Sequence, residues 1–168
     1  MGILPEYDND KIYQAVSDFF LLDVPGRQPS YAKIERRVSV VEGLSVQSAD
    51  VTGIKGSSKG NSTENRLVAG DDYWRAKKAI KTAIKSCSAT SAIIMQCRYL
   101  QGQKVWQVQA KANISGNATY QKADQLARYE FADVIEYAKD KYGVADSIIP
   151  NFLKLAEISR NEVKTSRN

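Results

Sequence analysis

Polar side chains with the chemistry to bind DNA follow a short break near the middle of the chain. The break, Ser115-Gly116-Asn117, interrupts the stretch NISGNATYQKADQLARYEF at residues 113–131. Asparagine and glutamine can pair with adenine, arginine and lysine with guanine or phosphate, and tyrosine with a sugar, a thymine methyl group or a phosphate. In a helix that begins at the break, the first turns carry seven candidate DNA contacts, namely Asn117, Thr119, Tyr120, Gln121, Lys122, Gln125 and Arg128.

Two lysines and a serine complete the set of candidate contacts. Lys104 and Lys111 precede the break, and Ser115 can cap the following helix through its hydroxyl group. Residues 104–128 fit a helix-turn-helix, in which a supporting helix, a tight turn and a polar recognition helix follow one another. An ordinary corner between two packed helices is the alternative. We assign Trp106 to packing against the core, because it stands beside two valines of the supporting helix.

A basic stretch without acids surrounds this region. From Tyr73 to Ala123 there is no Asp or Glu, whereas nine bases occur: Arg75, Lys77, Lys78, Lys81, Lys85, Arg98, Lys104, Lys111 and Lys122. A solvated helix surface normally mixes both signs, and a uniformly positive surface attracts a polyanion such as DNA. The stretch therefore favours double-stranded DNA as a partner, and a face that only keeps the chain in solution is the alternative.

Several classes of chemistry lack their usual residues. The chain has no histidine, which excludes Ser-His and Cys-His catalysis and the common zinc sites. Cys87 and Cys97 are too far apart for a paired-cysteine redox motif, so we expect two reduced core thiols. No Gly-rich phosphate loop occurs, and the acidic pair Asp71-Asp72 suits a helix N-terminus. We therefore expect a protein that is not an enzyme and that uses no cofactor and no metal.

The hydrophobic pattern divides the chain into four parts. Residues 1–41 form an N-terminal helical segment, with one helix over Asp10–Leu22 and a second after Ser30 whose valines also suit a strand. Residues 42–70 are rich in Gly, Ser, Thr and Asn and predict a flexible linker or a long loop. Residues 71–162 form the helix-turn-helix DNA-binding domain, and residues 163–168 form a disordered tail.

The third part is expected to be helical throughout. A helix capped at Asp71 or Asp72 ends at residues 86–88, the next ends before Gly102, and a short one contains Val105 and Val108. The long helix after the break ends at Gly143, and a last helix follows Ser147 with Pro150 in its first turn. The predicted fold class is all-α, a multi-helix domain with a helix-turn-helix, an N-terminal helical arm and a linker.

The sequence also bears on where the protein is located and on whether it self-associates. No apolar run approaches the length of a membrane span, and the N-terminus MGILPEYDND lacks the pattern of an export signal, so we expect a cytoplasmic protein without membrane contact. The cluster Phe19-Phe20-Leu21-Leu22 suits either the core or a second subunit. A homo-oligomer is therefore an open alternative.

Three segments within residues 73–142 carry a resemblance to a known family, namely CRYLQGQKVW, ISGNATY and QKADQLARYEFADVI. They resemble the ArpU family of phage late transcription regulators, which is similar to the fourth region of bacterial sigma factors. Two departures, at Val108-Gln109 and after Ser115, leave the register of the recognition helix open by one position. The resemblance implies a sequence-specific activator, encoded by a phage or prophage, that helps host RNA polymerase to start late packaging, structural or lysis genes in the host cytoplasm.

Two other classes stay open. A small terminase-like DNA-packaging protein is also helical and basic, although its DNA-binding module is expected near the N-terminus. A helical adaptor without DNA binding would leave the basic stretch without a role.

Overall fold

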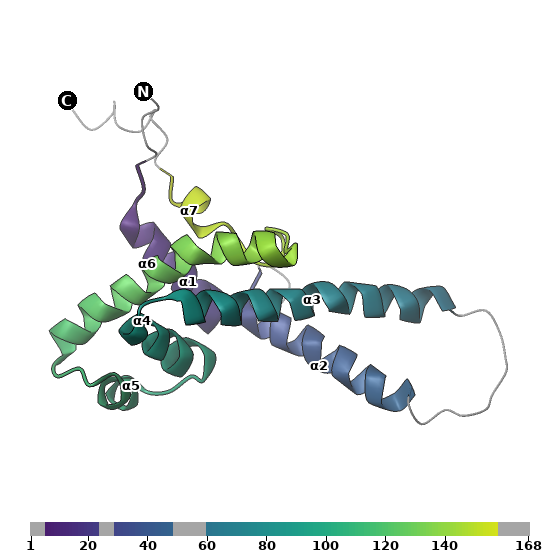
Figure 1. The fold of residues 1–168 in the computed structure, drawn as a ribbon, viewed down its shortest axis with the longest axis horizontal. Coiled ribbons are helices and arrows are strands. Elements are labelled where there is room, and N and C mark those ends of the chain that lie inside the picture. Colours follow the sequence, from purple (N-terminus) through teal and green to yellow (C-terminus); the bar gives the residue numbers. More distant parts are fainter. Residues whose placement is uncertain (1–5, 24–28, 49–59, 158–168) are drawn as a thin grey trace.

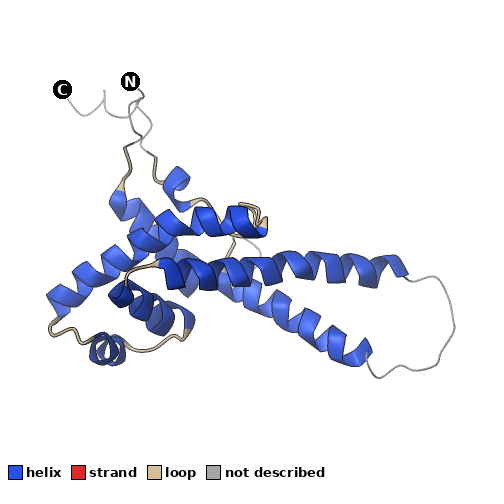
Figure 2. Cartoon of the chain, in the orientation of Figure 1, coloured by secondary structure: helices blue, strands red, loops and turns tan. Residues whose placement is uncertain are grey.

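The computed structural model describes residues 6–23, 29–48 and 60–157, and it includes the side chains there except those of residues 44–48 and 60–69. Its elements are the helices α1 Asn9–Leu21, α2 Tyr31–Ser48, α3 Gly60–Ser86, α4 Ala89–Ile94, the π-helix η1 Met95–Leu100, α5 Val105–Ala112, α6 Asn117–Tyr142 and α7 Phe152–Leu155. Over the described ranges the only β-type pairing is an isolated bridge between Tyr7 and Glu157 (Figure 2). The all-α prediction is confirmed.

The N-terminal helix α1 belongs to the core. Asp8 caps it by accepting hydrogen bonds from the backbone N–H groups of the two residues at positions 10 and 11, at 3.1 and 3.3 Å. Its inward positions are fully buried, and the ring of Phe20 lies 5.2 Å from that of Phe131 in α6. Leu21 and Leu22, at the end of the same apolar cluster, are about half exposed. The cluster is therefore divided between core and surface.

Helices α2 and α3 form an antiparallel hairpin whose far end extends away from the rest of the molecule (Figure 1). The second half of α3 belongs to the core and packs against α6. The Ser30 hydroxyl caps α2 by accepting a hydrogen bond from the Lys33 backbone N–H at 3.2 Å. The valines in this segment follow helical spacing with Val38 buried, so the strand alternative is wrong. Close packing holds the hairpin: a Cβ atom on Gly70 would lie 2.0 Å from Cγ2 of Val41.

The structure differs from the predicted linker and the predicted acidic cap. Residues 42–48 belong to α2 and residues 60–70 to α3, while residues 49–59 lie outside the described residues. Because α3 begins well before them, Asp71 and Asp72 stand inside a helix instead of capping one. Each forms an ion pair with Arg75, at 3.1 and 2.6 Å. The predicted tail, residues 163–168, also lies outside the description.

Helix α6 is the central element. It packs against α1, α3 and α4, and Phe131 and Ile135 on its inner face are fully buried. It ends at Gly143, which adopts the left-handed conformation (φ 65°, ψ 47°), as the sequence predicts. The helical segment formed by α4 and η1 also ends as predicted, ahead of Gly102 at φ 63°.

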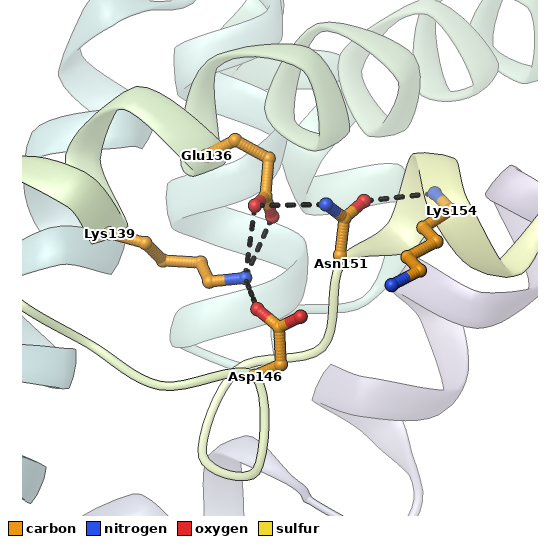
Figure 3. Close-up of polar contacts among 5 residues, drawn as sticks. All are labelled: Glu136, Lys139, Asp146, Asn151 and Lys154. Carbon is orange, nitrogen blue, oxygen red and sulfur yellow. Dashed lines mark hydrogen bonds and ion pairs between the residues drawn. The ribbon is translucent and has the colours of Figure 1, made fainter.

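A polar cluster fixes the chain after α6 (Figure 3). The Lys139 ammonium group is buried and forms ion pairs with Glu136 at 2.9 Å and Asp146 at 2.6 Å. Glu136 also accepts a hydrogen bond from Asn151 at 3.1 Å, and Asn151 caps α7 by accepting from the Lys154 backbone N–H. The last helix thus begins after Asn151, so the prediction of Pro150 in its first turn is wrong.

Candidate nucleic-acid interface

The segment that the sequence identifies as a DNA-binding region forms a corner between two helices, and we call residues 104–128 the α5–α6 corner. In Figure 1, α5 is seen nearly end-on while α6 runs across the view, so the two helices cross steeply. The chain turns through Asn113, which is left-handed (φ 54°, ψ 44°), and Gly116 (φ 87°). Since few side chains tolerate a positive φ, these two residues determine where α5 ends and α6 begins.

Ser115 does not have the predicted role. The N-cap position of α6 is Gly116, with no capping side chain, and Ser115 is exposed in the turn. The helix therefore starts at Asn117, which resolves the register that the sequence left open by one position. Asn117 accepts a hydrogen bond from the Gln109 side chain at 3.2 Å, and this bond links the start of α6 to α5.

Most of the predicted contacts are exposed. They are Lys104 and Lys111 on the α5 side, Ser115 in the turn, and Asn117, Thr119, Gln121, Lys122 and Gln125 on α6. Residues 117, 121 and 125 are spaced one helical turn apart, so their amide groups form one stripe on the outer face of α6.

Tyr120 departs from the prediction because it points into the molecule. Its side chain is only 6% exposed, and its hydroxyl group has no hydrogen-bond partner among the residues that the structure describes. Burial raises the pKa of Tyr120, and the Asp124 carboxylate adds to the effect. Tyr120 and Ala127 are two helical turns apart and both are buried, so they lie on the inner face of α6. The amide stripe lies on the outer face of the same helix.

Arg128 is the second departure, because it binds protein instead of solvent. It forms an ion pair with Asp124 at 2.8 Å, and it donates hydrogen bonds to the Tyr13 carbonyl group at 3.1 Å and the Ser17 hydroxyl at 2.9 Å. Asp124 also accepts a hydrogen bond from Tyr99 at 2.9 Å, and burial raises the Tyr99 pKa. Arg128 thus joins α1 to α6, a contact that no local sequence pattern reveals.

The sequence predicts that Trp106 packs against the core, but its side chain is 65% exposed, so this prediction is wrong. It stands two residues before Val108, which is fully buried, and two residues on a helix differ by about 200° in direction. The valine therefore faces the core and the tryptophan faces solvent at the corner.

The basic stretch keeps most of its charge free. Arg75 and Lys77 pair with acids outside the stretch, and Arg98 donates to the Gln103 carbonyl group at 3.1 Å. The other six bases are exposed and form no ion pair with any described residue: Lys78, Lys81, Lys85, Lys104, Lys111 and Lys122. Three of these lysines belong to the α5–α6 corner.

Two observations in the described ranges concern metal binding and cysteine chemistry. No three His, Cys, Asp or Glu side chains gather there as a metal ion would require. Cys87 and Cys97 are free thiols, and burial, with a smaller effect of Glu130, raises the pKa of Cys87 to about 12. A thiol with this pKa is almost entirely protonated near neutral pH and is a poor nucleophile.

The sequence does not predict that α1 lies beside the α5–α6 corner. Asn9 and Tyr13 of α1 lie beside Lys122, Gln125 and Tyr129 of α6 and enclose a shallow groove with them. The amphipathic pattern of α1 predicts a buried face but not the helix against which that face packs.

No family model, curated protein or solved structure matches this chain. None of the helices in the described part is both long and apolar enough to cross a membrane.

Proposed function

We propose that this protein binds double-stranded DNA sequence-specifically and regulates transcription, with the first turns of α6 as the recognition helix. The observation that carries the proposal is the amide stripe of Asn117, Gln121 and Gln125, exposed on the outer face of α6 next to Lys122. Amide side chains can pair bidentately with adenine in the major groove, which is wide enough to admit a helix.

The unpaired lysines support the same assignment. Lys104 and Lys111 lie on α5, and Lys122 lies on α6, so positive charge is present on both helices of the corner. Phosphate contacts orient a protein on the duplex, while base contacts give specificity. We therefore assign the lysines to the DNA backbone and the amides to the bases.

The resemblance to the ArpU regulators narrows the proposal to activation of late phage genes. The residues that carry this narrowing are the segments that resemble the family, CRYLQGQKVW, ISGNATY and QKADQLARYEFADVI. The promoter location, the help to host RNA polymerase and the timing derive from the resemblance alone.

A small terminase-like packaging protein is the second candidate, and the α2–α3 hairpin is the observation that favours it. The hairpin extends beyond the helical core (Figure 1), and a projecting helical arm offers surface for self-association. The two functions differ in the DNA that they select, which is a promoter for a regulator and a packaging site for a terminase subunit.

The test is a gel-shift series with fragments of the encoding genome, followed by footprinting of the fragment that binds. Lys122→Glu and Gln121→Ala should each weaken specific binding by about 1–3 kcal/mol without loss of folding. Lys154→Glu makes the same charge change at an exposed lysine of α7 and should leave affinity nearly unchanged. Wild-type affinity in both corner variants would exclude α6 as the recognition helix.

The gel-shift series also tests the adaptor alternative, since an adaptor would shift no fragment. For a fragment that binds, a salt titration tests the role of the lysines. If three lysines contact phosphates, log affinity should fall with log salt at a slope of about −2.7, and a flat response would show that these lysines do not contact the DNA backbone.

A further inference from the structure

A shallow groove runs between α1 and α6 beside the proposed reading face. It has a volume of about 310 Å³ and is open to solvent, and it is lined by Asn9, Tyr13, Lys122, Gln125, Leu126 and Tyr129. Two of these residues, Lys122 and Gln125, already belong to the candidate DNA contacts. The groove therefore continues the proposed interface from α6 onto α1.

The lining has the chemistry of an anion site. Five of its six side chains carry hydrogen-bond donors, one of them a lysine ammonium group, and none is a carboxylate. Asp8 caps α1, and Asp124 of α6 pairs with Arg128. Asp10, which also adjoins Asn9 in the sequence, is exposed and places one negative charge near the start of α1. A phosphate group, which has only acceptors, matches this set of donors.

The groove also offers apolar surface. Leu126 is 53% exposed and Tyr129 is 36% exposed, although both belong to the helix that forms the core of the molecule. A deoxyribose ring next to a phosphate has the mixed polarity that such a lining accommodates. The walls are fixed in advance, because Arg128 binds the Tyr13 carbonyl group and the Ser17 hydroxyl and so holds α1 against α6.

We propose that this groove binds the sugar-phosphate backbone of duplex DNA, so that α1 adds backbone contacts at the edge of the recognition helix. The inference rests on the proposed DNA-binding function and extends it to the N-terminal helix. In this arrangement Lys122 is shared, since it lies both on the corner and in the groove.

Two variants of the full chain test the groove without touching the amide stripe, namely Asn9→Ala and Tyr129→Phe. Each removes a donor to a charged phosphate and should weaken duplex binding roughly tenfold. Because phosphate contacts carry no sequence information, the loss should be the same on the selected fragment and on unrelated duplex DNA. Tyr137→Phe is the matched control, as Tyr137 is 75% exposed on the same helix and does not line the groove.

Thermal melting of each variant verifies that the fold is intact. If the wild-type chain binds duplex and both groove variants bind like Tyr137→Phe, the groove is not a backbone site, while the proposed function stands. A loss confined to the selected fragment would also overturn the inference, because it would indicate base reading. If the wild-type chain binds no duplex, the proposed function and this inference fail together.

Discussion

Glu130 of α6 accepts two hydrogen bonds from Ser88, one from its backbone N–H at 2.8 Å and one from its hydroxyl group at 3.0 Å. Ser88 is the N-cap residue of α4, and its own side chain caps no backbone group of that helix. The Glu130 carboxylate of α6 therefore accepts the hydrogen bonds of the N-cap residue of α4. Negative charge is favourable at a helix N-terminus.

Glu130→Ala should lower the free energy of unfolding by about 1–2 kcal/mol, because the Ser88 backbone N–H loses its acceptor, whereas the Ser88 hydroxyl group can still donate to Ser91. Urea denaturation with an unchanged m-value would show this loss. Asp133→Ala, at an exposed acid one turn further along α6, is the control and should change stability by less than about 0.5 kcal/mol. Equal stability of the two variants would argue against the cap.

For the buried hydroxyl group of Tyr120, we expect that its removal does not lower stability. Tyr120→Phe should leave stability unchanged or raise it by up to about 1 kcal/mol, because it removes a buried polar group that has no partner in the described structure. Tyr99→Phe, which removes the hydrogen bond to Asp124, should instead cost about 1–2 kcal/mol in the same urea experiment. Gel shifts should show no loss of DNA affinity in Tyr120→Phe, and a marked loss would restore Tyr120 as a contact.

The hairpin of α2 and α3 can be tested with two of its glycines. Gly70→Ala places a Cβ atom against Val41 and should destabilise the protein by about 1–3 kcal/mol. Gly43→Ala, where no atom lies within 4 Å of the added Cβ, should stabilise it by about 0.5–1 kcal/mol through helix propensity. Calorimetric melting temperatures that shift in the same direction for both variants would contradict the close packing.

The buried ammonium group of Lys139 predicts a strong coupling. Lys139→Met should cost about 2 kcal/mol, because Glu136 and Asp146 lose their cation; both are partly exposed, so water offsets some of the loss. The double variant Lys139→Met/Glu136→Gln should recover part of that cost, because it removes one uncompensated charge. A double-mutant cycle with no coupling energy would show that the Lys139–Glu136 ion pair in Figure 3 contributes nothing to stability.

The two tryptophans should differ in accessibility. A Trp74→Phe chain, in which only Trp106 emits, should fluoresce at long wavelength and be quenched strongly by acrylamide. A Trp106→Phe chain should be quenched less, because Trp74 is partly buried and has the Lys77 ammonium group 5.9 Å from its ring centre. The reverse order would place Trp106 in the core, as the sequence alone suggests.

The predictions that succeeded depend on local chemistry. The sequence predicts the end of α6 because Gly143 supplies a left-handed residue, and it predicts α1 because Ile12, Val16 and Phe19 recur at helical spacing. The failures involve partners distant in sequence. The polar composition of residues 42–70 predicts a linker, but residues 60–70 form the start of α3. Composition does not show that α3 packs against α2.

In the candidate site, too, local chemistry and distant contacts have different outcomes. Residue type predicts the exposed amides and lysines, whereas the prediction that Tyr120 is exposed is wrong because α6 begins after Gly116 and turns Tyr120 inward. Arg128 was misplaced because a guanidinium group at that spacing suits phosphate as well as it suits the carbonyl group of Tyr13. Only the packing of α1 across α6 distinguishes the two.

Helix α6 has 26 residues without a break, which gives a rod about 39 Å long. One end carries the amide stripe, and the polar cluster around Lys139 locks the other end, where α6 also packs against α3. In Figure 1 the corner and the far end of the hairpin, where α2 ends and α3 begins, lie on opposite sides of the molecule. A duplex held at the corner would thus set the direction in which the hairpin points.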